Sequence, residues 1–303
     1  MRNIQLILIM LVVSVSFAYG QQIESYTDYF SKSRFTDNSN DFHNKEHGHG
    51  DLVRYGIKYS QLLSIKLNKH NQPTIWNVSA GLSMVRNNNS GEISTIVPRD
   101  IINLGAMVSY LHPISPRWSM AFSLGCGIYS QPNKISFNSI LANGGCIVIY
   151  EINPSLSIGL GVGITNSFGV PMVMPTGYLK WVLKRRFELD VDLTGQMKIT
   201  ASTIFGERFR FSWNIVEFDA MSAVVRHDNK DKICSTMMLN SYFSQTFSVT
   251  DKFSIFANIG VNLLRFSSLS ERKLKYMFGN ENLSEKRQFS PSLQLGVGLR
   301  YGF

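Results

Sequence analysis

The chain has few cysteines and, after its first twenty residues, no long apolar run. Its three cysteines are Cys126, Cys146 and Cys234, and their number and scatter exclude the disulfide framework of a small secreted domain. No later segment contains the ~18 consecutive apolar residues that indicate a membrane-spanning helix. The sequence therefore excludes a helical membrane protein. It does not exclude a β-barrel, because barrel strands alternate and never build a long apolar run.

Motifs for catalysis or nucleotide binding are also missing. Gly159, Gly161 and Gly163 alternate inside an apolar stretch rather than at a strand-to-helix turn, so they do not form a phosphate-binding loop. No second partner can be identified for His227 and Asp228 that would complete an acid–base or nucleophilic site. We therefore predict that the protein is not an enzyme and has no cofactor. We also expect no nucleic-acid partner, although 30 basic residues stand against 21 acidic ones.

The residues His43, Glu46, His47, His49 and Asp51 form a dense cluster of candidate metal ligands. The segment around them shows no pattern that would hold ligands in a fixed geometry. We predict no metal site, with a solvated polar tail as the default interpretation. The role of the His43, His47 and His49 segment stays open.

The first residues have the pattern of a secretory signal peptide. Arg2 supplies positive charge, residues 4–15 are apolar, and residues 18–20 supply small side chains before a cleavage site. The following stretch is polar, lacks alternation and is expected to be partly disordered. The sequence thus predicts a signal peptide over 1–20, a polar N-terminal periplasmic segment over 21–50, and a barrel over 51–303.

The rest of the chain alternates with the period of two that strands show. From Leu293 to Phe303 the apolar side chains share one face, whereas Gln, Gly and Arg300 share the other. A register slip would turn Arg300 toward lipid, at a cost of ~2–4 kcal/mol near the bilayer midplane. The same alternation recurs along the chain. Several polar faces are rich in Gly, Ser and Asn, which suit the inside of a barrel better than a water-facing surface.

This alternation predicts an all-β fold, an antiparallel transmembrane β-barrel of about twelve strands, since single-chain bacterial barrels have an even number. Ten or fourteen strands would fit the same pattern. Aromatic residues near strand ends fit an interfacial girdle, namely Tyr110, Trp118, Tyr129, Tyr150, Trp181, Tyr301 and Phe303. The predicted strands are 51–66, 74–85, 101–111, 117–130, 135–152, 155–166, 176–184, 186–199, 205–218, 235–250, 253–266 and 289–303.

The lengths of the links between the predicted strands do not all agree with the side of the membrane on which each link would lie. With both barrel ends in the periplasm, the long, charged links 219–234 and 267–288 would lie outside, as outer loops do. The long 86–100 link and the short 153–154 turn would then each lie on the wrong side, which indicates a misplaced hairpin in the N-terminal half.

Three groups of residues resemble a known family. They are Gly169-Val170-Pro171 with Pro175-Thr176-Gly177, the run from Glu217 to Val225, and the closing run from Gly298 to Phe303. They resemble a domain-of-unknown-function family of bacterial, Bacteroidetes-type outer-membrane barrels. The resemblance implies an outer-membrane location and no catalytic residues. It also implies that Leu299, Tyr301 and Phe303 form the terminal signal that barrel-assembly machinery recognises.

Charged residues on two neighbouring predicted strands are candidates for the barrel interior. Glu188, Asp190 and Asp192 alternate on one strand, and Arg208 and Arg210 alternate on the next. If the strands pair, opposite charges meet across them. This predicts a charge ladder in the lumen, which either stabilises the barrel or forms a selectivity constriction. Acid–base catalysis by the carboxylates is a third interpretation.

Basic residues gather in the last long link, at Arg272, Lys273, Lys275, Lys286 and Arg287. They are expected to contact the phosphates of lipopolysaccharide and outer-membrane lipid, with an ordinary solvated loop as the alternative. As a whole the sequence predicts a narrow pore or transport barrel of unknown substrate. A closed structural barrel that binds lipopolysaccharide or a partner is the alternative, and an outer-membrane hydrolase is a second one.

Overall fold

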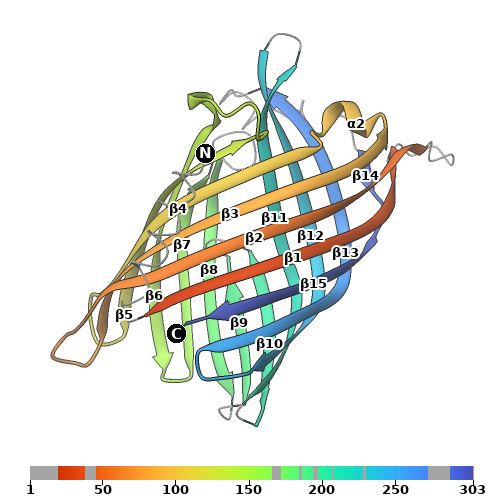
Figure 1. Ribbon diagram of the computed structural model, residues 1–303. Coiled ribbons are helices and arrows are strands. Elements are labelled where there is room, and N and C mark those ends of the chain that lie inside the picture. The colour runs from red at the N-terminus through yellow and green to blue at the C-terminus, as the bar shows by residue number, and fades with distance from the viewer. Residues whose placement is uncertain are drawn as a thin grey trace, which may run out of the picture.

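The computed structural model describes residues 20–37, 46–165, 172–183, 186–193, 197–206, 208–227, 230–271 and 287–302. These residues form one antiparallel sheet that closes on itself as a barrel (Figure 1). The predicted signal peptide lies outside the described residues, apart from Gly20. In the described part of the chain, no helix is long and apolar enough to cross a membrane.

Each strand pairs with the next along the chain, and β1 pairs with β15 to close the ring. A short helix, α2 (Ile93–Ile96), and one 3-10 turn (Phe137–Ser139) lie between strands. The strands are β1 (Gln21–Asp37), β2 (Glu46–Leu67), β3 (Pro73–Gly91), β4 (Asp100–Pro113), β5 (Trp118–Ser130), β6 (Ile140–Asn153), β7 (Leu156–Thr165), β8 (Met172–Leu183), β9 (Phe187–Asp192), β10 (Lys198–Phe205), β11 (Phe209–His227), β12 (Lys230–Ser248), β13 (Phe253–Glu271), β14 (Arg287–Phe289) and β15 (Ser292–Tyr301).

The barrel has fourteen strands and not the twelve predicted. The fifteen labels count one strand twice, because β14 and β15 both run between β1 and β13 and are two parts of one strand. One additional strand is β1, so the barrel begins at Gln21 and the boundary predicted at residue 50 is wrong. The other is β10, because the single strand predicted over 186–199 is in fact β9 and the start of β10, separated by a turn. Met197 in that turn has a positive φ of 46°.

These two strands correct the topology as well as the count. Adding β1 reverses the direction of every later strand up to β9, and adding β10 restores it. The long 86–100 link and the short 153–154 turn therefore move to the sides expected of them. The 219–234 segment is another correction. It is not a loop, because most of it continues β11 and β12 as a long hairpin.

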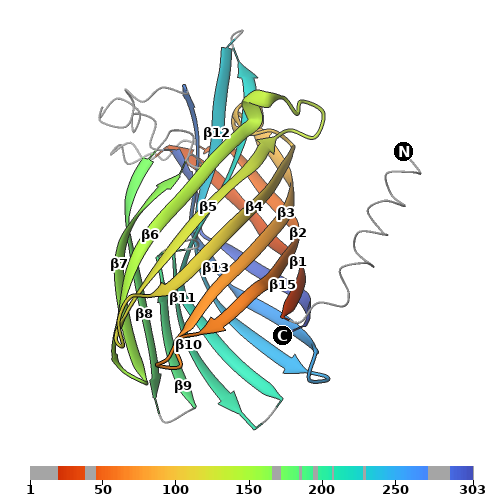
Figure 2. The same cartoon turned by 90° about the vertical axis from the view of Figure 1, so that its left-hand side faces the viewer.

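The two ends of the barrel differ in the length of their links. We call one the turn end, where β1 begins, β15 ends, and the links are short: 68–72, 114–117, 154–155, 184–186, 206–208 and 249–252. We call the other the loop end, where every link but one has at least five residues: 38–45, 92–99, 131–139, 166–171, 193–197, 228–229 and 272–286. The exception joins β11 to β12, which rise above the other strands (Figures 1 and 2). Short turns are typical of the periplasmic end of such barrels.

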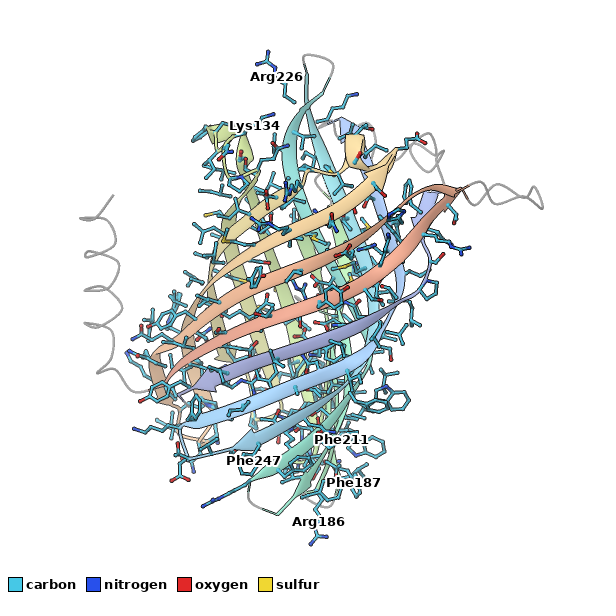
Figure 3. All side chains as sticks on the ribbon, turned by 45° about the vertical axis from the view of Figure 1, so that its right-hand side comes forward. Lys134, Arg186, Phe187, Phe211, Arg226 and Phe247 are labelled. Carbon is cyan, nitrogen blue, oxygen red and sulfur yellow. The ribbon has the colours of Figure 1, made fainter. Side chains whose placement is uncertain are left out.

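Apolar side chains cover the outside of the barrel. Leu124, Leu160 and Val297 are 73%, 78% and 61% exposed, as expected of residues that face lipid. Aromatic pairs lie near the turn end, with ring centroids 4.4 Å apart for Trp76 and Tyr110 and 4.6 Å for Trp118 and Tyr150. Phe187, Phe211 and Phe247 gather at the same end, whereas Lys134 and Arg226 lie at the loop end (Figure 3). Tyr129, predicted as part of the girdle, instead lines the interior.

Candidate functional site in the barrel interior

An apolar cluster fills the interior at the loop end. Its buried side chains come from β1–β4, β11, β12 and β14, from α2 and from the link after α2, and they are Phe30, Phe35, Leu52, Val85, Ile93, Val97, Ile101, Met221, Ala223, Val225, Cys234, Met238 and Phe289. We call this set the apolar plug. Such a cluster inside a barrel blocks the loop end to a polar solute in this conformation.

The β11–β12 hairpin supplies the centre of the plug. Residues 221–225 of β11 are buried on both faces, whereas a strand of a barrel wall normally has one face on the lumen and one on lipid. One face joins the plug, and on the other face Val224 packs with Leu141 and Ile233. Val224 also pairs with Ser130 of β5, which is not a neighbour of β11 in the sheet. The hairpin therefore crosses the interior and packs against the far wall.

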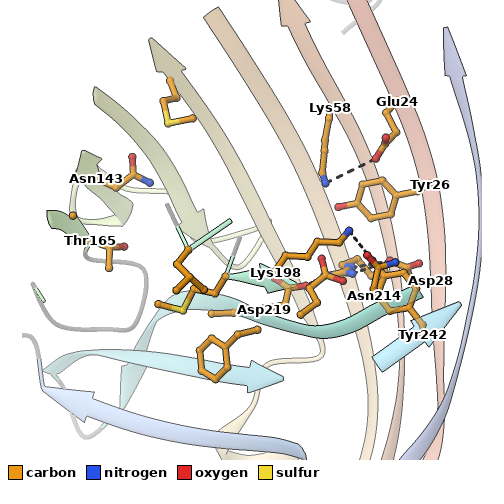
Figure 4. A pocket seen from close by; sticks show the side chains of 18 of the residues that line it. Glu24, Tyr26, Asp28, Lys58, Asn143, Thr165, Lys198, Asn214, Asp219 and Tyr242 are labelled. Atoms are coloured by element: carbon orange, nitrogen blue, oxygen red, sulfur yellow. Dashed lines mark hydrogen bonds and ion pairs between the residues drawn. The ribbon is translucent and has the colours of Figure 1, made fainter. Parts of the chain in front are cut away.

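A polar cavity of about 420 Å³ lies between the plug and the turn end (Figure 4). One side is formed by β1, β2, β11 and β15, which contribute charged residues, including Glu24, Lys58 and Arg300. The facing side is formed by β5–β8 and contributes small or neutral side chains such as Ser123, Asn143 and Thr176. The volume lies in the range of small-molecule sites.

Arg54 of β2 is the central charge of the lumen. Its Nε and Nη2 atoms donate to Asp28 Oδ2 of β1 at 3.1 and 2.8 Å. Its Nη1 atom donates to Asp219 of β11. Both Arg54 and Asp28 are largely buried, and truncating one partner of a buried ion pair leaves an uncompensated charge, at a cost of ~3–5 kcal/mol. The Arg54–Asp219 contact spans the lumen and fixes the base of the hairpin.

A second group of charges lies nearer the turn end. Arg300 of β15 donates to Glu24 Oε2 through Nε at 3.0 Å and Nη2 at 2.6 Å. Lys58 Nζ lies 3.9 Å from the other Glu24 oxygen. Acidic and basic groups are therefore paired on the same side of the lumen. The cavity does not present one wall of each sign, and its lining carries no excess of either charge.

Aromatic rings fill the space above several inward glycines on this side. Tyr26 lies over Gly56, its partner on β2, and Phe256 lies over Gly298, its partner on β15. These inward glycines therefore do not leave room in the lumen. Gly105 on β4 differs, because a Cβ there would meet no heavy atom closer than 3.8 Å.

Comparison with known proteins gives a family for this chain. Residues 18–302 match the family described as a domain of unknown function, DUF6268. The chain belongs to this family. No curated protein matches the chain. The predicted membership of a domain-of-unknown-function family is thus confirmed, whereas the Bacteroidetes type is not shown.

Solved structures of outer-membrane proteins resemble this DUF6268 chain at low identity. The KdgM porin, in complex with disordered oligogalacturonate, is 7% identical with a TM-score of 0.34, covering 93% of this chain and 99% of that one. The COG4313 outer membrane channel from Pseudomonas putida F1 is 9% identical with a TM-score of 0.46, covering 95% and 97%. The Pseudomonas putida toluene transporter TodX is 11% identical with a TM-score of 0.39, covering 96% and 92%.

The predicted charge ladder is brought together only in part. Glu188 contacts Arg210, and its other oxygen lies 3.2 Å from Lys180 Nζ. The strands of Glu188 and Arg210 do not pair as expected, because β10 lies between them, and the contact forms across the short Ser202 side chain. Asp190 and Asp192 lie opposite Thr200 and Lys198. Arg208 lies in the turn before β11, outside the ladder.

The remaining predicted residues lie at the ends of the strands or outside the described residues. Leu299 and Tyr301 face outward on β15, and Phe303 is not described. Arg272, Lys273, Lys275 and Lys286 fall outside the described residues, and Arg287 begins β14 opposite Asp37. His43 and Asp228 are not described either. His47, His49 and Asp51 belong to β2, and no group of three possible metal ligands occurs among the described residues.

The sequence pattern missed Asp28, Arg54 and Asp219. Asp28 lies on β1, whose outward face mixes Ser25 and Thr27 with Tyr29. Because Tyr26 and Phe30 point inward, a one-sided apolar signal is absent. Asp219 was placed in an outer loop. The only sequence signal for Asp219 as a lumen residue is the run from Glu217 to Val225, which is polar at its start and apolar at its end.

Proposed function

We propose that the protein is an outer-membrane transport barrel that takes up a small polar solute and is gated at its loop end by the β11–β12 hairpin. The outward apolar surface and the aromatic pairs near the turn end support a membrane location. The short links support a periplasmic turn end.

The observation that carries the proposal is the position of the hairpin relative to the cavity. A polar cavity of about 420 Å³ ends at a plug whose centre is a single hairpin, not the barrel wall. The crossing contacts of the hairpin are side-chain packing, one backbone bridge and the Arg54–Asp219 ion pair, whereas β12 stays paired with β13 as far as Lys232. Release of the crossing contacts would let the hairpin swing out of the lumen together with the end of β13, and an element with two such positions acts as a gate.

A closed interaction barrel is the second candidate function. The filled loop end and the paired lumen charges favour it, because both are what a barrel without passage needs. In that case residues at the loop end would form the binding surface. Arg272, Lys273, Lys275, Lys286 and Arg287 would bind lipopolysaccharide phosphates.

Current through single proteins in planar bilayers distinguishes the two functions. In Asp219→Asn the hairpin loses its ionic contact, while Arg54 keeps Asp28 as a partner. We expect rare openings in the unchanged protein and openings several times more frequent in this variant. Asp251→Asn, in the exposed turn after β12, is the matched control and leaves the openings unchanged.

Two outcomes would contradict the gate. If both proteins migrate as folded barrels and neither ever shows a large opening, the closed interaction barrel is the better account. If large openings occur equally often in both proteins, solute passes but the hairpin does not control it.

A further inference from the structure

Buried polar atoms without a partner gather along one side of the plug. Asn240, Asn262 and Ser292 lie opposite one another on β12, β13 and β15, and all three are buried. Asn262 Nδ2 donates to Asn240 Oδ1 at 2.7 Å. Asn240 Nδ2, Asn262 Oδ1 and Ser292 Oγ find no hydrogen-bond partner in the described part of the protein. We call these three residues the polar row, and it contains both donors and acceptors without a hydrogen-bond partner.

The row continues toward the cavity. Gln294 and Asn258 line the cavity and lie on the inward faces of β15 and β13, next to the row. Their Oε1 and Oδ1 atoms are also buried without a partner among the described side chains and backbone. The buried row therefore lies directly beside the polar lining of the cavity.

The row continues toward the loop end through Arg265. This side chain is 1% exposed, and its guanidinium carbon lies 3.7 Å from the centre of the Phe289 ring. Its Nη2 atom donates to Ser33 Oγ at 3.0 Å and to the Gly50 carbonyl oxygen at 2.7 Å, whereas Nε has no partner among the described residues. Asn89, the strand partner of Gly50, has another unused buried oxygen at the loop end.

Groups of this kind are costly unless water reaches them. A buried amide without a hydrogen bond costs several kcal/mol in an apolar medium, and an unpaired buried charge costs more. Buried waters typically satisfy two to four such groups each, and the row offers them both unused donors and unused acceptors. Among the described side chains, the polar row and its two continuations hold most of the buried unpartnered atoms, and Ser222 Oγ on β11 is a further one.

We propose that this row lines a hydrated route past the plug, through which small inorganic anions pass while the hairpin is closed, and that Arg265 sets the preference for anions. A fixed guanidinium beside a narrow water path attracts anions and repels cations. No carboxylate among the described side chains lies within ion-pair distance of Arg265, and Asp51 acts on it only through space, so part of its charge acts on the route. The inference rests on the proposed transport function and names small inorganic anions as the solutes that pass in its closed state.

The test is the reversal potential of the small closed-state current in a potassium chloride gradient. We expect the unchanged protein to prefer chloride, Arg265→Gln to lose that preference, and Arg265→Lys to keep it. Arg86→Gln is the matched control, because it removes one positive charge near the same end of the barrel from an exposed ion pair with Asp100. It leaves the reversal potential unchanged.

A second pair of variants tests the route without removing a charge. Asn262→Leu dries the row and should reduce the closed-state current severalfold, whereas Asn153→Leu, at the exposed end of β6 and outside the cavity lining, should not. Heat-modifiable migration shows that each variant is folded. A current without chloride preference, a preference that survives in Arg265→Gln, or no closed-state current would overturn the inference. Frequent large openings in Asp219→Asn would still support the transport function.

Discussion

Gly298 shows how single residues determine what the lumen can hold. A Cβ on this residue would lie 2.3 Å from Phe256 Cζ and 2.6 Å from the Ser25 carbonyl oxygen. The ring belongs to a packed side of the lumen and the oxygen to the backbone, so neither can move freely. At Gly81, by contrast, the nearest heavy atom would be 3.8 Å away. The two glycines have the same alternating position in sequence, and only the structure separates them.

The same substitution should therefore have different effects at the two glycines. Gly298→Ala should destabilise the barrel by ~1–3 kcal/mol, the usual cost of overpacking, and should lower the temperature at which the folded band disappears from a denaturing gel. Gly81→Ala should leave that temperature unchanged. Equal effects of the two substitutions would show that the packing of the Phe256 ring does not require a glycine at position 298.

Among the strands, those with a one-sided apolar pattern could be predicted and those without it could not. The alternation of β15 fixes its register, and its inward Arg300 pairs with Glu24 as a lumen residue should. The pattern of β1 is mixed, since Tyr26 and Phe30 point inward while Tyr29 lies on the outward face that also carries the short hydroxyl residues. Its assignment as a strand depends on pairing with β2, the next strand along the chain, and with β15, which lies at the other end of the sequence.

The closure by β1 can be tested by cross-linking. Thr27 and Val297 lie directly opposite each other, which is a suitable separation for a disulfide. With the three native cysteines changed to alanine, Thr27→Cys with Val297→Cys should cross-link on oxidation and change the migration of the boiled protein. Thr27→Cys with Leu293→Cys, further along β15, should not. Equal cross-linking in both pairs would mean that residues 21–37 are not held in this register.

Across the whole molecule, the class of protein followed from its sequence and most of the interior did not. The Glu188–Arg210 contact could be anticipated, because the two strands are close in sequence. The Arg54–Asp219 contact could not, because it joins residues 165 positions apart across the lumen. The position of the β11–β12 hairpin could not be predicted either, since apolar residues in a long link do not show whether the link projects outward or folds into the barrel.

The central claim is a closed barrel in the outer membrane, and heat-modifiable migration tests it most directly. Protein extracted from outer-membrane fractions would be compared with and without boiling on a denaturing gel. The structure predicts a faster-migrating unboiled band in that fraction, because the hydrogen-bonded ring of strands resists detergent. A single band at the same position in both lanes, or recovery of the protein as a soluble periplasmic species, would contradict the account.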